Sequence, residues 1–128
     1  MKTQISLENV IYNLAKNTKE PCVILTDRGL MDTAGYIGWD AFHKILEKQN
    51  WSIEELRDAR YDAIIHLVTA ADGAPQFYDQ KNFNSYETPE EAIERDHALK
   101  TVYLGHNKVY FIDNVKDEGF SGKMRRTI

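Results

Sequence analysis

Asp27 is the residue whose position points most directly to chemistry. It follows residues 22–26, an apolar run rich in β-branched side chains, which is typical of a strand buried on both faces of a parallel sheet. A carboxylate at the end of such a strand can hold magnesium, because a hard divalent cation prefers oxygen ligands and often binds only one or two carboxylates. The alternative is an acid that only caps the next turn, and the pattern leaves both interpretations open.

Arg57 and Arg60 form the second candidate group. They lie three residues apart on one predicted helix face, close enough to bind one phosphate together, with Asp58 and Tyr61 placed to orient them. The alternative is a solvated helix face with local ion pairs. The four histidines lack metal-ligand spacing, so His66, inside a predicted strand, is expected to be a core histidine. Neither a nucleophile-elbow pattern nor a Gly-rich phosphate loop is present.

Composition limits the kind of protein. The chain has 128 residues, 42% of them hydrophobic, which suits a single core. A net charge of −4 argues against a general electrostatic attraction to nucleic acid. No apolar run approaches the roughly 20 residues of a membrane span, and the N-terminus lacks a signal peptide, so we expect a cytoplasmic protein. The single cysteine, Cys22, excludes an internal disulfide and is expected to be buried.

The first half of the chain is expected to alternate helices with loops around the 22–26 strand. Apolar spacing predicts an amphipathic helix over residues 6–19, stopped by Pro21. Residues 29–38, dotted with glycines, are expected to form a loop before a second helix at 39–49. A capping box of Ser52 and Glu55 predicts a third helix that runs through Arg60.

The second half repeats the alternation. Residues 63–69 and 109–112 are predicted to be buried strands. Between them, Thr88 and Pro89 open a long helix that Gly105 ends, and a basic terminal helix follows from about residue 120. Alternating helices and strands favour a parallel α/β sheet that places ligands at the carboxyl edge of its strands.

Several segments together resemble the P-loop NTPase domain of the NadR-type AAA family, the kind of domain also found in the TRPL translocation defect protein. The resemblance covers nearly the whole chain from about residue 7. It is carried by TDRGLMD at 26–32, LRDARYDAIIHLVTAADGA at 56–74 with Phe77 and Tyr78, ETPEEA at 87–92, Gly105 with His106, and Ile112 to Asn114.

The resemblance implies a three-layer parallel α/β sheet of the P-loop NTPase, nucleotide kinase-like type. It also implies GTP or ATP as ligand with Mg²⁺, and phosphoinositide contact as a further family property. Asp27 would occupy the Walker B position and face the metal, and residues of about 79–88 would form a lid. The positions implied near the nucleotide are Arg28, Arg57, Arg60, His106 and Asn114.

The sequence also departs from the family pattern. Only about twenty residues precede the predicted Walker B strand, and none is glycine, so the Walker A loop that would cradle phosphates is absent from the chain. In the lid, Ser85 stands where the family commonly has an arginine before Tyr86 and Glu87. His106 is followed by Asn107 in place of proline.

The missing loop has a structural consequence. In this fold the P-loop strand lies between the Walker B strand and the strand at 63–69, so residues 1–128 are expected to form a single incomplete domain with a gap in its sheet. Unpaired strand edges with apolar sides need partners. We therefore expect another chain, or an N-terminal segment, to fill the gap.

Three functions compete on this sequence. The favoured hypothesis is a degenerate NTPase-like domain that acts as a structural or interaction subunit of a larger assembly and is not catalytic alone. The alternative is the C-terminal half of a GTP- or ATP-binding regulatory domain, completed by a separate P-loop segment. An autonomous phosphotransferase or hydrolase is disfavoured, since the chain would have to stabilise triphosphate charge without a P-loop lysine.

Overall fold

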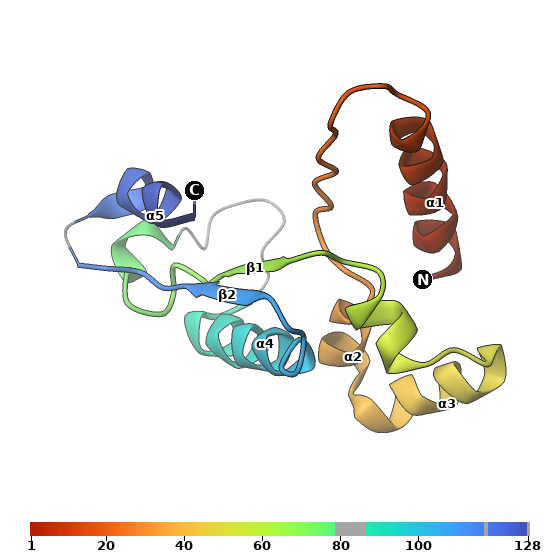
Figure 1. The fold of residues 1–128 in the computed structure, drawn as a ribbon. Coiled ribbons are helices and arrows are strands. Elements are labelled where there is room, and N and C mark those ends of the chain that lie inside the picture. The colour runs from red at the N-terminus through yellow and green to blue at the C-terminus, as the bar shows by residue number, and fades with distance from the viewer. Residues whose placement is uncertain (79–86, 117, 128) are drawn as a thin grey trace.

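The computed structural model describes residues 1–78, 87–116 and 118–127 (Figure 1). Helices alone precede the first strand, and helices alternate with short strands only from that strand onward. In chain order they are α1 (Lys2–Lys16), α2 (Asp32–Ile37), α3 (Trp39–Gln49), the π-helical turn η1 (Glu54–Asp58), β1 (Ile64–Leu67), the 3₁₀ turn η2 (Pro75–Phe77), α4 (Pro89–Val102), β2 (Val109–Ile112) and α5 (Gly119–Thr127).

β1 and β2 form a parallel pair, in register from Ile64 opposite Val109 to Leu67 opposite Ile112. The chain passes from β1 to β2 through α4, which lies along one side of the strands in Figure 1. The predicted parallel α/β arrangement is confirmed for these two strands. The full three-layer sheet is not, because the described residues form only this two-stranded sheet.

The hydrophobic core lies among the helices. Phe42, Leu30, Met31 and Val102 are its largest fully buried side chains, and they come from α3, the turn before α2, and the end of α4. The same cluster also contains Ala34, Leu46, Leu56 and Tyr103. The core therefore holds α2, α3 and α4 together instead of covering both faces of the sheet.

One face of the sheet is open, contrary to the prediction that the strand at 63–69 is buried on both faces. Burial alternates along β1, and Ile65, Leu67 and Tyr110 remain 49%, 42% and 54% exposed. These three residues define what we call the open face. The alternation is that of a sheet with a helix on one side only.

The predicted strand at 22–26 is wrong. These residues have no regular secondary structure and pair with no described strand, and Val23 and Leu25 are 86% and 89% exposed. Cys22 is likewise exposed, not buried. A strand requires a neighbour for its backbone groups, and the described residues supply none for this segment. We call residues 17–28 the tether, because they link α1 to the rest of the chain in a long arch (Figure 1).

The predicted loop at 29–38 contains α2 instead. Its glycine, Gly35, is required for packing and not for a turn, since an added Cβ would lie 2.8 Å from Leu99 Cδ2 on α4. α1 also differs from its prediction: it begins at Lys2 and ends at Lys16, before the predicted end at residue 19.

The predicted helix ends agree best with the structure where a local side chain caps the helix. The capping box of α4 is complete: the Glu91 amide donates to Thr88 Oγ1 at 3.2 Å, and the Thr88 amide donates to Glu91 Oε2 at 2.8 Å. The Ser52–Glu55 box is also present. The helix it opens is a single π turn that ends at Asp58, so the prediction of a helix through Arg60 is wrong.

The predicted second helix at 39–49, the long helix opened at Thr88 and the terminal helix are confirmed as α3, α4 and α5. The predicted lid at 79–88 lies outside the described residues except for its last two positions. Among the described residues, every helix is too short or too polar to traverse a bilayer.

Candidate functional site

Asp27 and Arg28 lie at the end of the tether. Asp27 is exposed and makes no hydrogen bond or ion pair with the described residues. Arg28 has a positive φ of 73°, and its guanidinium lies 3.5 Å from Asp32 Oδ2. Its carbonyl accepts a hydrogen bond from Gln4 Nε2 of α1 at 2.9 Å. The end of the tether is thus attached to α1.

A pocket of about 400 Å³ lies where the tether passes α1. Both α1 and the tether contribute apolar and polar side chains to its walls. The lining residues are Gln4, Leu7, Glu8, Ile11, Ile24, Leu25, Thr26, Asp27 and Arg28.

Arg57 caps the end of α4. Its guanidinium donates to the Leu104 carbonyl at 2.6 Å and to both carboxylate oxygens of Asp58, at 2.7 and 3.0 Å. The hydrogen bond to Asp58 raises the pKa of Arg57 and lowers that of Asp58. Gly105 lies against the guanidinium at a φ of 99°, where a Cβ would come within 3.1 Å of Arg57 Nη2. A cation at a helix C-terminus satisfies free carbonyls and the helix dipole.

Arg60 binds α1. Its Nε donates to Glu8 Oε2, and its Nη2 donates to the Ile5 carbonyl at 3.1 Å and to Asn9 Oδ1 at 3.0 Å. Arg57 and Arg60 therefore have separate partners and do not converge on one point. The reason is local: η1 ends at Asp58, so Arg60 lies beyond the turn that carries Arg57.

Tyr61 joins the same contact to the core. Its hydroxyl accepts from the Leu30 amide at 2.9 Å and donates to Glu8 Oε1 at 3.2 Å. Burial, reinforced by the Glu8 carboxylate, raises the pKa of Tyr61 to about 12. The phenol is therefore a fixed donor at neutral pH.

His106 is buried, and both of its ring nitrogens are used. Nε2 lies 2.8 Å from the Tyr61 carbonyl, and Nδ1 lies 3.1 Å from the Lys108 amide nitrogen. A carbonyl can only accept and an amide N–H can only donate, so the ring is the neutral Nε2–H tautomer. His106 thus connects the turn after α4 to the residues preceding β1.

Asn114 lies at the carboxyl end of the parallel pair. Its Nδ2 donates to the carbonyls of Thr69 and Asp72 at 2.7 and 2.6 Å, while its Oδ1 accepts from Lys123 Nζ at 2.9 Å. Lys123 also donates to the Val68 carbonyl. Through Lys123, α5 therefore contacts the carboxyl edge of the sheet.

Two buried charged residues close to the sheet were not predicted as site residues. Lys123 is 7% exposed, and the apolar spacing of its helix does not signal this, since Phe120, three residues earlier, is 71% exposed. Asp96 is also 7% exposed; its Oδ1 lies 3.1 Å from His66 Nε2 and accepts from the Thr69 amide at 2.8 Å. Its Oδ2 is buried with no partner in the described residues. His66 is a hydrogen-bonded core histidine, as expected.

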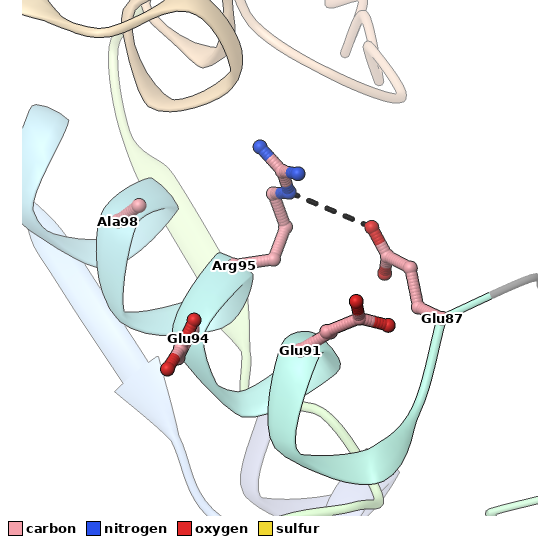
Figure 2. A pocket seen from close by; sticks show the side chains of 5 residues that line it. All are labelled: Glu87, Glu91, Glu94, Arg95 and Ala98. Carbon is pink, nitrogen blue, oxygen red and sulfur yellow. Dashed lines mark ion pairs between the residues drawn. The ribbon is translucent and has the colours of Figure 1, made fainter.

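A second pocket, of about 520 Å³, opens on α4 (Figure 2). Three glutamates line it together with Arg95, whose Nε lies 3.5 Å from Glu87 Oε1. The same guanidinium lies over the Tyr36 ring, 4.8 Å from its centroid. The lining residues are Glu87, Glu91, Glu94, Arg95 and Ala98.

The predicted positions fall in three places. Asp27, Arg28 and Arg60 lie around the N-terminal half of α1; Arg57 and His106 lie at the turn after α4; Asn114 lies at the carboxyl edge of the sheet. In the described part of the chain, no three acidic, histidine or cysteine side chains are grouped to hold a metal.

Comparison with known proteins gives one finding. A family model described as an AAA domain matches residues 1–118. No curated protein and no solved structure matches the chain.

Proposed function

Because the chain belongs to the AAA domain family of P-loop NTPase-like proteins, we propose that it is an NTPase-like subunit that acts by binding another polypeptide and is not catalytic alone. The observation that carries this proposal is the open face of the sheet, where Ile65, Leu67 and Tyr110 remain 42–54% exposed. A parallel sheet is normally covered on both faces.

The tether supports the same proposal. Val23 and Leu25 are almost fully exposed, and residues 19–28 form no backbone–backbone hydrogen bond with another described residue. The backbone groups of its apolar run, residues 22–26, are therefore free to pair with an added strand. The partner that fits is an apolar strand followed by a helix, because it would supply both a ladder and a cover for the open face.

The residues present fit a nucleotide poorly. Arg57, Arg60, His106 and Asn114 are all engaged by protein groups. Asp27 offers one free carboxylate, and no second acidic side chain is grouped with it in the described residues. We therefore derive no catalytic step for this chain by itself.

The second candidate is the C-terminal half of a GTP- or ATP-binding domain, with Asp27 as the Mg²⁺ ligand. The observation in its favour is that Asp27 is exposed and unengaged beside Arg28, on the wall of the 400 Å³ pocket. This candidate requires a P-loop segment from elsewhere.

The test combines nucleotide titration with light scattering on the isolated chain. With Mg²⁺ and fluorescent GTP or ATP analogues, we expect no binding, and a mass that rises with protein concentration as open faces associate. Ile65→Lys with Tyr110→Lys should reduce that association, whereas Leu104→Lys, at an equally exposed site away from the sheet, should not.

Two results would decide against the first proposal. Tight Mg²⁺-dependent binding that Asp27→Ala abolishes would assign a nucleotide site to the chain alone. If the protein stays monomeric and the open-face variants do not change its mass, the open face is not a docking surface. Binding only after an N-terminal strand–P-loop–helix extension is fused would select the second candidate.

A further inference from the structure

The Glu8 carboxylate lies in a built cradle of donors. Arg60 Nε donates to its Oε2, and Tyr61 Oη and Gln4 Nε2 donate to its Oε1 at 3.2 and 3.0 Å. The side chains of Arg60 and Glu8 are only 18% and 14% exposed. Two of the three donors, Arg60 and Tyr61, lie outside α1. They belong to the part of the protein that follows the tether, which we call the body.

The rest of α1 is weakly attached. None of its residues is buried, and apolar side chains that normally fix a helix remain exposed by 48–65%: Leu7, Val10, Ile11 and Leu14. Of its apolar residues, only Ile5 packs against the core cluster, together with Met1 before the helix. The polar cradle is therefore the main attachment of α1 to the body.

We propose that Arg60 and Tyr61 form an oxyanion site which Glu8 fills as an internal ligand, so that a phosphate or carboxylate bound there releases α1. A guanidinium makes the same charge-assisted N–H···O bonds to carboxylate and to phosphate. When the anion replaces the Glu8 carboxylate, the N–H groups of Arg60 and the O–H group of Tyr61 still have an acceptor. Tyr61 can donate because it remains protonated at neutral pH. This inference does not depend on the proposed function.

Release has a measurable consequence because α1 is short. An isolated helix of about 12–15 residues is marginal in water, so α1 should unfold when it leaves the cradle. Its amides would then exchange with solvent rapidly, while those of α4 and β1 keep their protection. Displacement would also expose the apolar residues of α1 to a partner.

The first experiment is hydrogen exchange with mass spectrometry on the full chain in chloride, phosphate or acetate at matched ionic strength. We expect a loss of protection in α1, with α4 unchanged, in phosphate or acetate relative to chloride. Release by phosphate alone identifies a phosphoryl ligand, and release by acetate alone identifies a carboxylate such as an acidic peptide. Equal protection of α1 in all three salts would overturn the proposal.

The second experiment separates an occupied site from a merely structural ion pair. Glu8→Gln should lose α1 protection already in chloride, and its Arg60 Nε–H resonance should shift at several-fold lower anion concentration than in the native chain. Glu20→Gln, the same change on the tether, should behave like the native chain. If Glu8→Gln frees α1 without improving anion binding at Arg60, the inference fails.

A cation control completes the design. Arg60→Ala should abolish the anion-induced change in α1, whereas Arg125→Ala, which removes an exposed arginine of α5, should leave it intact. Because Arg60→Ala itself weakens the cradle, Tyr61→Phe serves as a milder second variant and should reduce the anion response. An unchanged response in both variants would place the anion elsewhere and overturn the proposal.

Discussion

Tyr103 Oη donates a 2.6 Å hydrogen bond to Asp32 Oδ1, joining the end of α4 to the first turn of α2. Both residues are buried, at 5% and 9% exposure. Burial and the neighbouring Asp32 raise the pKa of Tyr103, so the phenol stays protonated. Gly29 makes room for it, since a Cβ there would lie 2.1 Å from Tyr103 Oη.

Tyr103→Phe should therefore destabilise the fold by about 1–3 kcal/mol, because it leaves a buried carboxylate oxygen without its donor. The free energy of unfolding in urea measures this effect. Tyr110→Phe removes an exposed hydroxyl from the open face and is the matched control, expected to change stability by less than about 0.5 kcal/mol. Equal effects of the two variants would show that the Asp32 bond is not stabilising.

Gly35→Ala should destabilise the packing of α2 on α4 by about 1–3 kcal/mol, because the new methyl group overpacks a filled contact. The obstacle is Leu99, whose Cδ2 would lie 2.8 Å from the added Cβ. In a Leu99→Ala background the same substitution should cost less, and a double-mutant cycle measures the difference. Strict additivity of the two changes would contradict this account.

Asp96 should make the fold acid-sensitive. Burial raises its pKa, but hydrogen bonds from His66 and from the Thr69 amide outweigh burial and hold the pKa below its ordinary value. Its contribution is therefore present above the unfolded pKa of about 3.9, and is lost as the pH falls through the lower folded value.

Urea unfolding as a function of pH tests the contribution of Asp96. Asp96→Asn should remove this part of the acid dependence, while Glu94→Gln, an exposed neighbour on α4, should preserve it. An acid profile that Asp96→Asn leaves unaltered would show that other carboxylates carry the effect.

Lys123 should make stability rise with pH on the alkaline side. Burial lowers its pKa, so between that value and the unfolded value of about 10.4 the unfolded chain binds the proton more tightly. Stability then increases as the pH rises through this window. Lys123→Met should abolish the increase, whereas Lys44→Met on the exposed side of α3 should retain it; the same increase in both variants would contradict the prediction.

Elements with local signals could be predicted from sequence. The capping box of Thr88 and Glu91 and the apolar spacing of α3 depend on neighbours a few residues away, and both elements were predicted closely. The run at 22–26 has the composition of a strand, but strand formation depends on a pairing partner that composition does not reveal. The sequence favours a loop at Gly35 because nothing nearby shows its close contact with Leu99, which lies 64 residues further along the chain.

The candidate site was harder to predict. Arg57 and Arg60 were assigned to one helix face, but η1 closes with a bond from the Ala59 amide to the Glu54 carbonyl, five residues apart, and ends before Arg60. No local pattern distinguishes such a π turn from an α turn. The burial of Lys123 has no local signal, because its acceptors, Val68 and Asn114, are brought to it only by the assembled sheet.

The separation of Glu8 from its cradle affects how the protein is made. Arg60 follows Glu8 by 52 residues, and synthesis proceeds at about 5–20 residues per second. For roughly 3–10 s, the residues of α1 are therefore on the growing chain before the arginine that will hold them as a helix. During that interval its apolar stripe is available to chaperones, or to a partner that captures it before the polar contact can close.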